Sequence, residues 1–206
     1  VEMLPQILAL LDLEMARVLH NHLQSEGIEL LLCTQVLGFD ETKAGLTVRF
    51  VEETLDCDMV VMAVGVRPDT AFLKDSGLAM TERGLLLVDE HMRTNDPHVY
   101  ALGDAVQVKH FVTGAPSHIT LAGPANRQAR IVADNLCGIE SAYQGTQGSA
   151  IVQMLGLTIA ATGISEVQAK MAGADYDKVY SVAPSHATYF PSATEMTMKV
   201  IFERST

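Results

Sequence analysis

The stretch Tyr100–Ala105 reads YALGDA, an apolar run that ends on a glycine followed by a carboxylate. The run Tyr100–Leu102 predicts a buried strand, which Gly103 interrupts and Asp104 follows. In open α/β sheets, ligands bind beyond the carboxyl ends of strands, where a glycine lets a ligand approach the backbone and an acid can hold sugar or polyol hydroxyls. Taken alone, however, a Gly-Asp pair is more typical of a turn or a helix cap.

A predicted helix downstream gives this pair a context. Thr120–Pro124 (TLAGP) forms a small, glycine-bearing turn at the start of that helix, and Pro124 is tolerated in a first turn. The apolar positions of the helix are Ala125, Ala129, Val132, Ala133 and Leu136, and Gly138 follows its end near Cys137. The free N–H groups at its start carry partial positive charge and could face an anionic ring. An ordinary capped helix is the alternative, and the spacing does not exclude it.

The rest of the pattern first alternates helix and strand and then changes to strand pairs, which is typical of an α/β part followed by an α+β module. A helix is predicted over Asp12–Ser25, with Asp12 at its cap and Gly27 beyond its end. Further strands are predicted over Ile28–Leu32, Leu46–Phe50, Met59–Val64 and Leu85–Val88. Met59–Val64 is apolar throughout, as in a strand covered on both faces. After a linker at Gln144–Ser149, the predicted elements are strands over Ala150–Leu155, Leu157–Thr162, Lys178–Ala183 and Met196–Phe202 and a short helix over Glu166–Met171.

Composition narrows the classes of partner. The 206 residues include 14 Lys+Arg and 25 Asp+Glu, and the net charge of −11 disfavours a nucleic acid. No apolar run approaches the roughly 20 residues of a membrane helix, and nothing resembles a signal peptide, so we expect no membrane partner and a cytoplasmic location. Cys33, Cys57 and Cys137 lie apart among apolar residues, which predicts buried, reduced thiols without a catalytic role. The seven histidines form no ligand cluster, so no metal site is predicted.

Two segments together carry a resemblance to a known family. Thr94–Ala105 (TNDPHVYALGDA), followed by Leu121–Arg130 (LAGPANRQAR), closely resembles the second FAD motif of the pyridine nucleotide–disulfide oxidoreductases. Within that family the chain is most similar to the coenzyme A-disulfide reductase and NADH oxidase branch, in order along its whole length. The resemblance implies an α/β fold with partial Rossmann-like FAD- and NAD(P)-binding domains, followed by an α+β dimerisation domain. The implied boundaries are 1–65 for the C-terminal part of the NAD(H)-binding domain, 66–143 for the C-terminal part of the FAD-binding domain, and 144–206 for a truncated dimerisation domain.

The resemblance also implies roles for residues of the FAD motif. Asp104 would bond a ribitol hydroxyl of FAD, and Gly103 would allow that approach. The N–H groups of Leu121 and Ala122 would face the N1/O2 edge of the flavin, where a helix terminus stabilises the reduced, anionic ring.

Three further positions match the family outside this motif. Glu2 resembles the acid that ends the second strand of the nicotinamide domain, where a carboxylate accepts hydrogen bonds from ribose hydroxyls and favours NADH over NADPH. Gly65 matches the passage from the nicotinamide domain back to the FAD domain, and it also reads as a simple strand terminator. His186–Pro191 resembles a segment near the substrate site of the partner subunit, where Tyr189 could supply a hydroxyl. We favour a structural role for this aromatic side chain over a catalytic one.

For the intact family, the resemblance implies that a hydride passes from NADH to FAD. Electrons then reach a cysteine that attacks a disulfide or persulfide or is oxidised by peroxide, and oxygen is a further acceptor. The chain contains neither G-x-G-x-x-G nor that cysteine, opens without methionine on Val1, and stops just past an apolar run. We therefore expect an inactive fragment of a homodimeric enzyme that holds FAD weakly by itself. The alternatives are a ferredoxin-reductase-type flavoprotein and a non-catalytic dimerisation or scaffold module.

Overall fold

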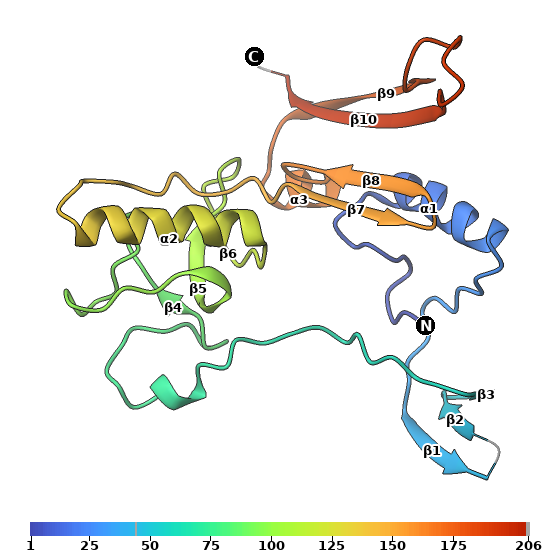
Figure 1. The fold of residues 1–206 in the computed structure, drawn as a ribbon, viewed down its shortest axis with the longest axis horizontal. Helices are drawn as coiled ribbons and strands as arrows, with labels where there is room; N and C mark the ends of the chain where they lie inside the picture. Colours follow the sequence, from blue (N-terminus) through green and yellow to red (C-terminus); the bar gives the residue numbers. More distant parts are fainter. Residues whose placement is uncertain (44, 205–206) are drawn as a thin grey trace. The chain divides into compact units, whose positions relative to one another are not determined.

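A computed structural model describes residues 1–43 and 45–204 of the chain (Figure 1). The described residues form two units, each with its own packing. Unit 1 comprises Val1–Ala63, Gln153–Ile159 and the chain from Ile164 onward. Unit 2 comprises Val64–Val152 and Ala160–Gly163.

Helix α1 (Leu13–Ser25) of unit 1 confirms the first predicted helix. Its buried face is lined by residues three and four positions apart, as the periodicity requires. These are Ala16, Leu19 and Leu23. Gly27 adopts a φ of +84°, a left-handed value that suits glycine and ends the helix. Asp12 stands at the N-cap position as predicted, but its side chain does not cap this helix and is free to bond elsewhere.

A three-stranded antiparallel sheet follows in unit 1, in the order β1-β2-β3. The strands are β1 (Gly38–Thr42), β2 (Gly45–Arg49) and β3 (Thr54–Cys57). Strand β2 confirms the strand predicted over Leu46–Phe50, because the alternation buries Val48 and leaves Arg49 at the surface. There the Arg49 guanidinium contacts the carboxylate of Asp40 at 2.6 Å.

Two other predicted strands are wrong for this structure. Leu31 accepts a hydrogen bond from the N–H of Glu2 (2.8 Å), but Ile28–Leu32 forms no ladder with any described residue. Met59–Val64 forms no backbone hydrogen bond with described residues, and most of its apolar side chains are exposed, with Val61 77% and Val64 84% exposed. Hydrophobic pattern indicates which residues favour burial, whereas a strand also requires a neighbouring strand to pair with. The described residues provide none for these two segments.

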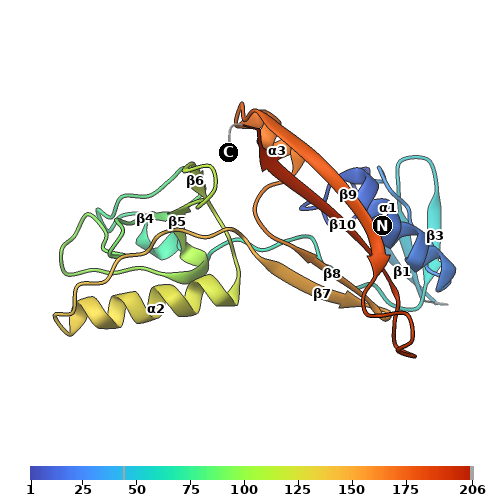
Figure 2. The same cartoon turned by 90° about the horizontal axis from the view of Figure 1, so that it is seen from above.

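The last part of unit 1 and the hairpin before it confirm the predicted strand pairs and short helix. Strands β7 (Ala150–Met154) and β8 (Leu157–Ala161) form a two-stranded hairpin. Helix α3 (Glu166–Met171) follows, and then β9 (Tyr176–Pro184) and β10 (Glu195–Glu203) pair as a long antiparallel ribbon (Figure 2). In this ribbon Lys199 lies opposite Tyr180, so these two side chains share one face.

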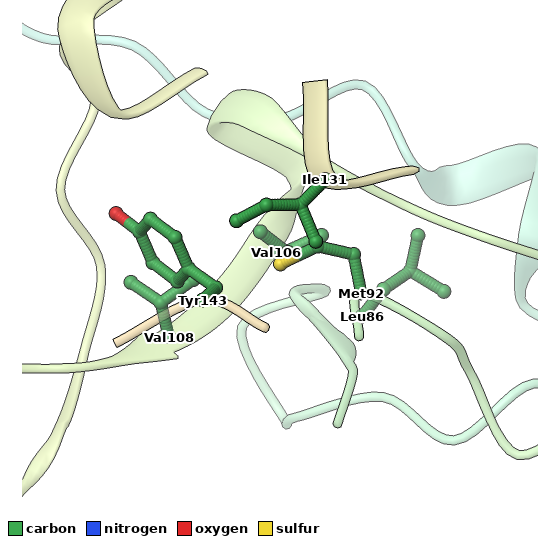
Figure 3. Packing of buried hydrophobic residues seen from close by; sticks show 6 residues of the cluster. All are labelled: Leu86, Met92, Val106, Val108, Ile131 and Tyr143. Atoms are coloured by element: carbon green, nitrogen blue, oxygen red, sulfur yellow. The ribbon is translucent and has the colours of Figure 1, made fainter. Parts of the chain in front are cut away.

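Unit 2 is built from short strands and one long helix. Strand β4 (Leu86–Leu87), the centre of the strand predicted over Leu85–Val88, pairs in parallel with β5 (Val106–Lys109). Strand β6 (Pro116–Ser117) pairs antiparallel with β5, and a 3-10 turn, η1, spans Ala71–Leu73. The strands and the long helix share one apolar core, shown in Figure 3. Its buried members are Leu86, Met92, Val106, Val108, Ile131 and Tyr143.

The long helix of unit 2, α2 (Ala122–Leu136), confirms the helix predicted after the TLAGP turn. Pro124 lies in its first turn, where the missing N–H has no intrahelical partner to lose. Cys137 is its C-cap, and Gly138 follows with a φ of +79°. Ile131 anchors the helix in the core of unit 2.

The segment Tyr100–Leu102 is not the continuous strand that its sequence predicts. Tyr100 forms an isolated bridge with Arg93, and the N–H of Thr94 donates to the carbonyl of Val99 (3.0 Å). The chain therefore turns back on itself here, which satisfies these backbone groups without a neighbouring strand. After Leu102 it forms a short 3-10 turn, η2 (Gly103–Ala105).

The predicted burial of the three thiols is also wrong. Cys33 and Cys137 are exposed and Cys57 is half-buried, and all three are free. Cys33 adopts a left-handed φ of +54° in the irregular segment between α1 and β1, and Cys137 is the C-cap of the long helix of unit 2. Apolar neighbours in sequence do not imply burial at such positions. In the part of the chain that the structure describes, no helix combines the length and apolar character needed to cross a bilayer.

Candidate functional site

The Gly103–Asp104 turn presents a carboxylate that bonds to none of the described residues. Gly103 has a φ of +75°, which side-chain-bearing residues rarely adopt. A Cβ built on it would lie 3.9 Å from the side chain of Ala125, so the turn passes close beside α2. Asp104 is exposed, and its carboxylate makes no hydrogen bond or ion pair with the described residues. It is therefore free to accept hydrogen bonds from an external ligand.

The amino end of α2 is open. Its N-cap, Leu121, provides no side-chain cap, and Pro124 has no N–H. No described residue accepts a hydrogen bond from the N–H groups of Leu121, Ala122 or Gly123. Such unpaired donors, together with the helix dipole, favour a negatively charged group at this end.

Two contacts bring the turn and this helix together within unit 2. The N–H of Gly103 donates to Oε1 of Gln128 on α2 (2.7 Å). The Nε2–H of His118, in the segment that leads into α2, donates to the carbonyl oxygen of Asp104 (2.8 Å). The structure therefore places four predicted site residues in one part of one unit, with a free acceptor on the turn and free donors on the helix. Such a pair of features can bind a ligand that has both hydroxyls and an anionic ring.

Neither Gln128 nor His118 was predicted from the sequence. Gln128 is 1% exposed and lies one helical turn from both Ala125 and Ile131 on the buried side of α2. A polar side chain on the apolar face of a predicted helix was the signal that could have identified it. The histidine offers no such signal, because its role depends on a contact with a turn that sequence alone does not place.

Gly65 and Glu2 lie in different units. Gly65, in unit 2, has a φ of +97° and open space around it, so its constraint is conformational. Glu2, in unit 1, is half-buried and uses Oε1 to accept the N–H of Leu4 (2.8 Å). Its backbone is held between Leu31 and Thr34 by hydrogen bonds of 2.8 and 3.0 Å. The position of this carboxylate is therefore well defined within its own unit.

Tyr189 lies in the loop between β9 and β10 of unit 1 and is 81% exposed. Its ring stacks on Phe190, with ring centroids 4.9 Å apart and planes at 29°. The ring centroids of His186 and Phe190 are 6.2 Å apart. A catalytic role for Tyr189 stays a prediction.

A buried ion cluster in unit 1 was also missed from the sequence. The Lys199 ammonium on β10 donates to carboxylates of Asp12 (2.7 Å), Glu14 and Glu166. The Lys199 side chain is only 5% exposed. Acid oxygens of the three carboxylates lie within 4.8 Å of one another, and the ammonium contacts all three, so the group is an ion-pair network. Residues 12 and 199 are too far apart in the chain for a local pattern to pair them.

The network shifts the acidity of its members. Hydrogen bonds from Lys178, Lys199 and the Tyr176 hydroxyl lower the pKa of Glu166 to about 2. Partial burial would raise the pKa of Glu14, but hydrogen bonds from Lys199 and Tyr180 outweigh it and lower that pKa to about 2. Burial alone would lower the pKa of Lys199, whereas hydrogen bonds to the three carboxylates raise it strongly. The charged forms are therefore the stable ones at neutral pH.

Comparison with known proteins gives the family. Residues 1–129 match the model of the family described as pyridine nucleotide-disulphide oxidoreductase, and the chain belongs to this family. An NADH oxidase of Enterococcus faecalis is 31% identical over 198 residues, which are 95% of this chain and 44% of that protein. This confirms the family that the paired motifs indicate.

Solved structures agree. The reduced CoADR-RHD of Bacillus anthracis is 39% identical, with a TM-score of 0.91, over 98% of this chain and 36% of that one. A NAD-dependent persulfide reductase from A. fulgidus is 32% identical, with a TM-score of 0.92, over 98% of this chain and 38% of that one. The predicted α/β fold class with Rossmann-like parts is thereby confirmed. The chain spans less than half the length of each of these three relatives.

Proposed function

We propose that this chain contributes cofactor-binding parts of an FAD-dependent oxidoreductase that passes electrons from NADH through the flavin to a disulfide, a persulfide, or oxygen or peroxide. The observation that carries the proposal is the free Asp104 carboxylate beside the open amino end of α2. Family membership supports it, as do the names of the relatives, which include an NADH oxidase and a NAD-dependent persulfide reductase.

The residues present fit the polyol and ring of a flavin. Asp104 would accept hydrogen bonds from ribityl hydroxyls, and Gly103 lets the ligand approach the backbone. The N–H groups of Leu121 and Ala122 would bind the N1/O2 edge and stabilise negative charge there. When bound, FAD accepts a hydride and releases electrons to an acceptor. The role of these residues is to hold the cofactor and to favour its reduced form electrostatically.

The flavin role is tested with Asp104→Ala in the full-length enzyme. The purified variant is expected to retain much less flavin per protein, measured by visible flavin absorbance, with an unchanged far-UV circular dichroism spectrum. Asp75→Ala is the matched control and should keep wild-type flavin, because Asp75 is another exposed acid of unit 2 whose carboxylate bonds to no described residue. Wild-type flavin content in Asp104→Ala would contradict the proposal.

Glu2 is assigned to the nicotinamide cofactor. A carboxylate held by its backbone at this position can accept hydrogen bonds from two ribose hydroxyls and repels a 2′-phosphate. Glu2→Ala is therefore expected to raise the KM for NADH far more than the KM for the electron acceptor. Glu2→Gln, which keeps an acceptor without charge, should narrow the preference for NADH over NADPH. Steady-state kinetics with both nucleotides measures this, and an unchanged KM for NADH in Glu2→Ala would refute the assignment.

We also infer that the enzyme is a homodimer whose contact includes one face of the β9–β10 ribbon. We call this surface the open face; its six apolar side chains are Val179, Ala183, Met196, Met198, Val200 and Phe202. A chain of net charge −11 repels its copies at most surfaces, whereas an apolar face can pair with itself. A cytoplasmic location and the lack of nucleic-acid and membrane partners stay predictions.

A further inference from the structure

The turn that presents Asp104 is held by its two backbone polar groups. On one side the Gly103 N–H donates to Gln128 Oε1 (2.7 Å), and on the other the Asp104 carbonyl accepts from His118 Nε2 (2.8 Å). Gln128 belongs to the second turn of α2, and His118 to the segment just before it. The acceptor on the turn and the donors on the helix are therefore linked by two side chains.

Gln128 is unusual in being a polar side chain that is 1% exposed beside Ile131 and the core of unit 2. Burying an amide without a partner is unfavourable, and an apolar side chain would fill the same space without that penalty. The hydrogen bond that Gln128 Oε1 accepts from the Gly103 N–H offsets this penalty. Gly103 has a left-handed φ of +75°, and this backbone conformation sets the direction of the Asp104 side chain that follows. The geometry of the turn thus depends on this amide.

His118 makes a bond that does not require the imidazole to be neutral. Its Nε2 must carry a proton to donate to a carbonyl, and both the Nε2–H tautomer and the imidazolium do so. The ring is exposed, so its removal leaves no cavity. It ties the carbonyl of Asp104 to a residue three positions before the N-cap Leu121.

We propose that Gln128 and His118 are positioning residues that hold the Asp104 carboxylate in register with the open end of α2. This inference rests on the proposed flavin function. It means that the two side chains increase the affinity for FAD without contacting it. Loss of one such hydrogen bond is expected to weaken FAD binding by up to about tenfold.

The test uses the full-length enzyme, stripped of flavin and titrated with FAD. Gln128→Met and His118→Ala are each expected to weaken FAD binding, while His118→Ala leaves the thermal midpoint of the apoprotein unchanged. Gln107→Met is the control in the same unit, because the Gln107 side chain makes no hydrogen bond with described residues.

A double-mutant cycle separates positioning from general stability. If Gln128 acts through Asp104, then Gln128→Met made in the Asp104→Ala background should weaken FAD binding little further. A merely structural role would lower FAD affinity by the same factor in both backgrounds, and this result would overturn the inference. Wild-type affinity in both Gln128→Met and His118→Ala would also overturn it while leaving the flavin function standing. A wild-type protein that takes up no FAD would overturn both.

Discussion

Lys199 is a buried ammonium, and its three carboxylate partners come from α1, the residue before it, and α3. Removing one partner of a buried ion pair leaves uncompensated charge and costs about 3–5 kcal/mol. We therefore expect Lys199→Met to lower the free energy of unfolding by several kcal/mol, measured by chemical denaturation. Lys170→Met is the matched control. The Lys170 side chain is 68% exposed, and its ammonium forms a longer ion pair, at 3.9 Å, with the same Glu166 carboxylate. Equal effects of the two substitutions would contradict the role assigned to the buried lysine.

The same cluster predicts a pH dependence. The pKa values of Glu14 and Glu166 are about 2 in the folded protein, below the ordinary value of 4.5. Between these values the unfolded chain binds more protons, so stability is present above about pH 5 and is lost as the pH falls toward about 2. Denaturation at a series of pH values should show this loss in the wild type and a shallower one in Lys199→Met. Parallel curves for the two proteins would show that the cluster does not control acid stability.

Single residues also show where sequence reasoning reaches its limit. The turn at Gly103 and Asp104 could be predicted because adjacent residues specify a turn, whereas their role toward a cofactor stays a prediction. Asp12 was predicted as a helix cap, but its carboxylate accepts the Glu166 N–H (3.0 Å) and binds Lys199. These partners are distant in sequence, and no local pattern contains that information. Gln128 lies between these cases, since its place on an apolar helix face is local and its partner is not.

At the scale of elements, α3 depends on its cap. Ser165 accepts the N–H of Gln168 through its hydroxyl, and the Gln168 side chain accepts the Ser165 N–H in return. A helix of six residues has little stability of its own. Ser165→Ala is expected to cost about 1 kcal/mol of unfolding free energy, and Ser165→Thr should restore most of it. Denaturation measures both, and a neutral Ser165→Ala would mean that tertiary contacts alone hold α3.

Helices and hairpins were predictable because both are specified by neighbours in the chain. The 3.6-residue period defined α1 and α2, and only Leu155 and Gly156 separate the two paired strands of the predicted β7–β8 hairpin. The strand predicted over Met59–Val64 was wrong for the opposite reason. Its apolar pattern is clear, but a strand also needs a partner strand, which comes from a distant part of a chain. The apolar pattern indicates that these side chains favour burial, but the described residues do not cover most of them.

At the scale of the whole molecule, the two faces of the β9–β10 ribbon differ in chemistry. One face carries Lys199, Lys178 and Tyr180, which meet the acidic cluster of unit 1. The open face has no charged residue near its centre, and Val200 and Phe202 remain 51% and 47% exposed. We therefore propose that this apolar patch is the surface through which two copies of the protein associate.

We expect Val200→Glu to weaken self-association of the full-length enzyme by more than about tenfold, because a dimer through the open face would bury that charge without a partner. Val182→Glu is the control: it makes the same substitution in the same ribbon on the opposite face, where Val182 is 61% exposed. Sedimentation velocity over a concentration series measures both variants. A wild-type monomer, or equal weakening by the two substitutions, would exclude the open face as the contact. Val200 lies on that face and Val182 on the opposite one, so a dimer through the open face should be weakened by Val200→Glu alone.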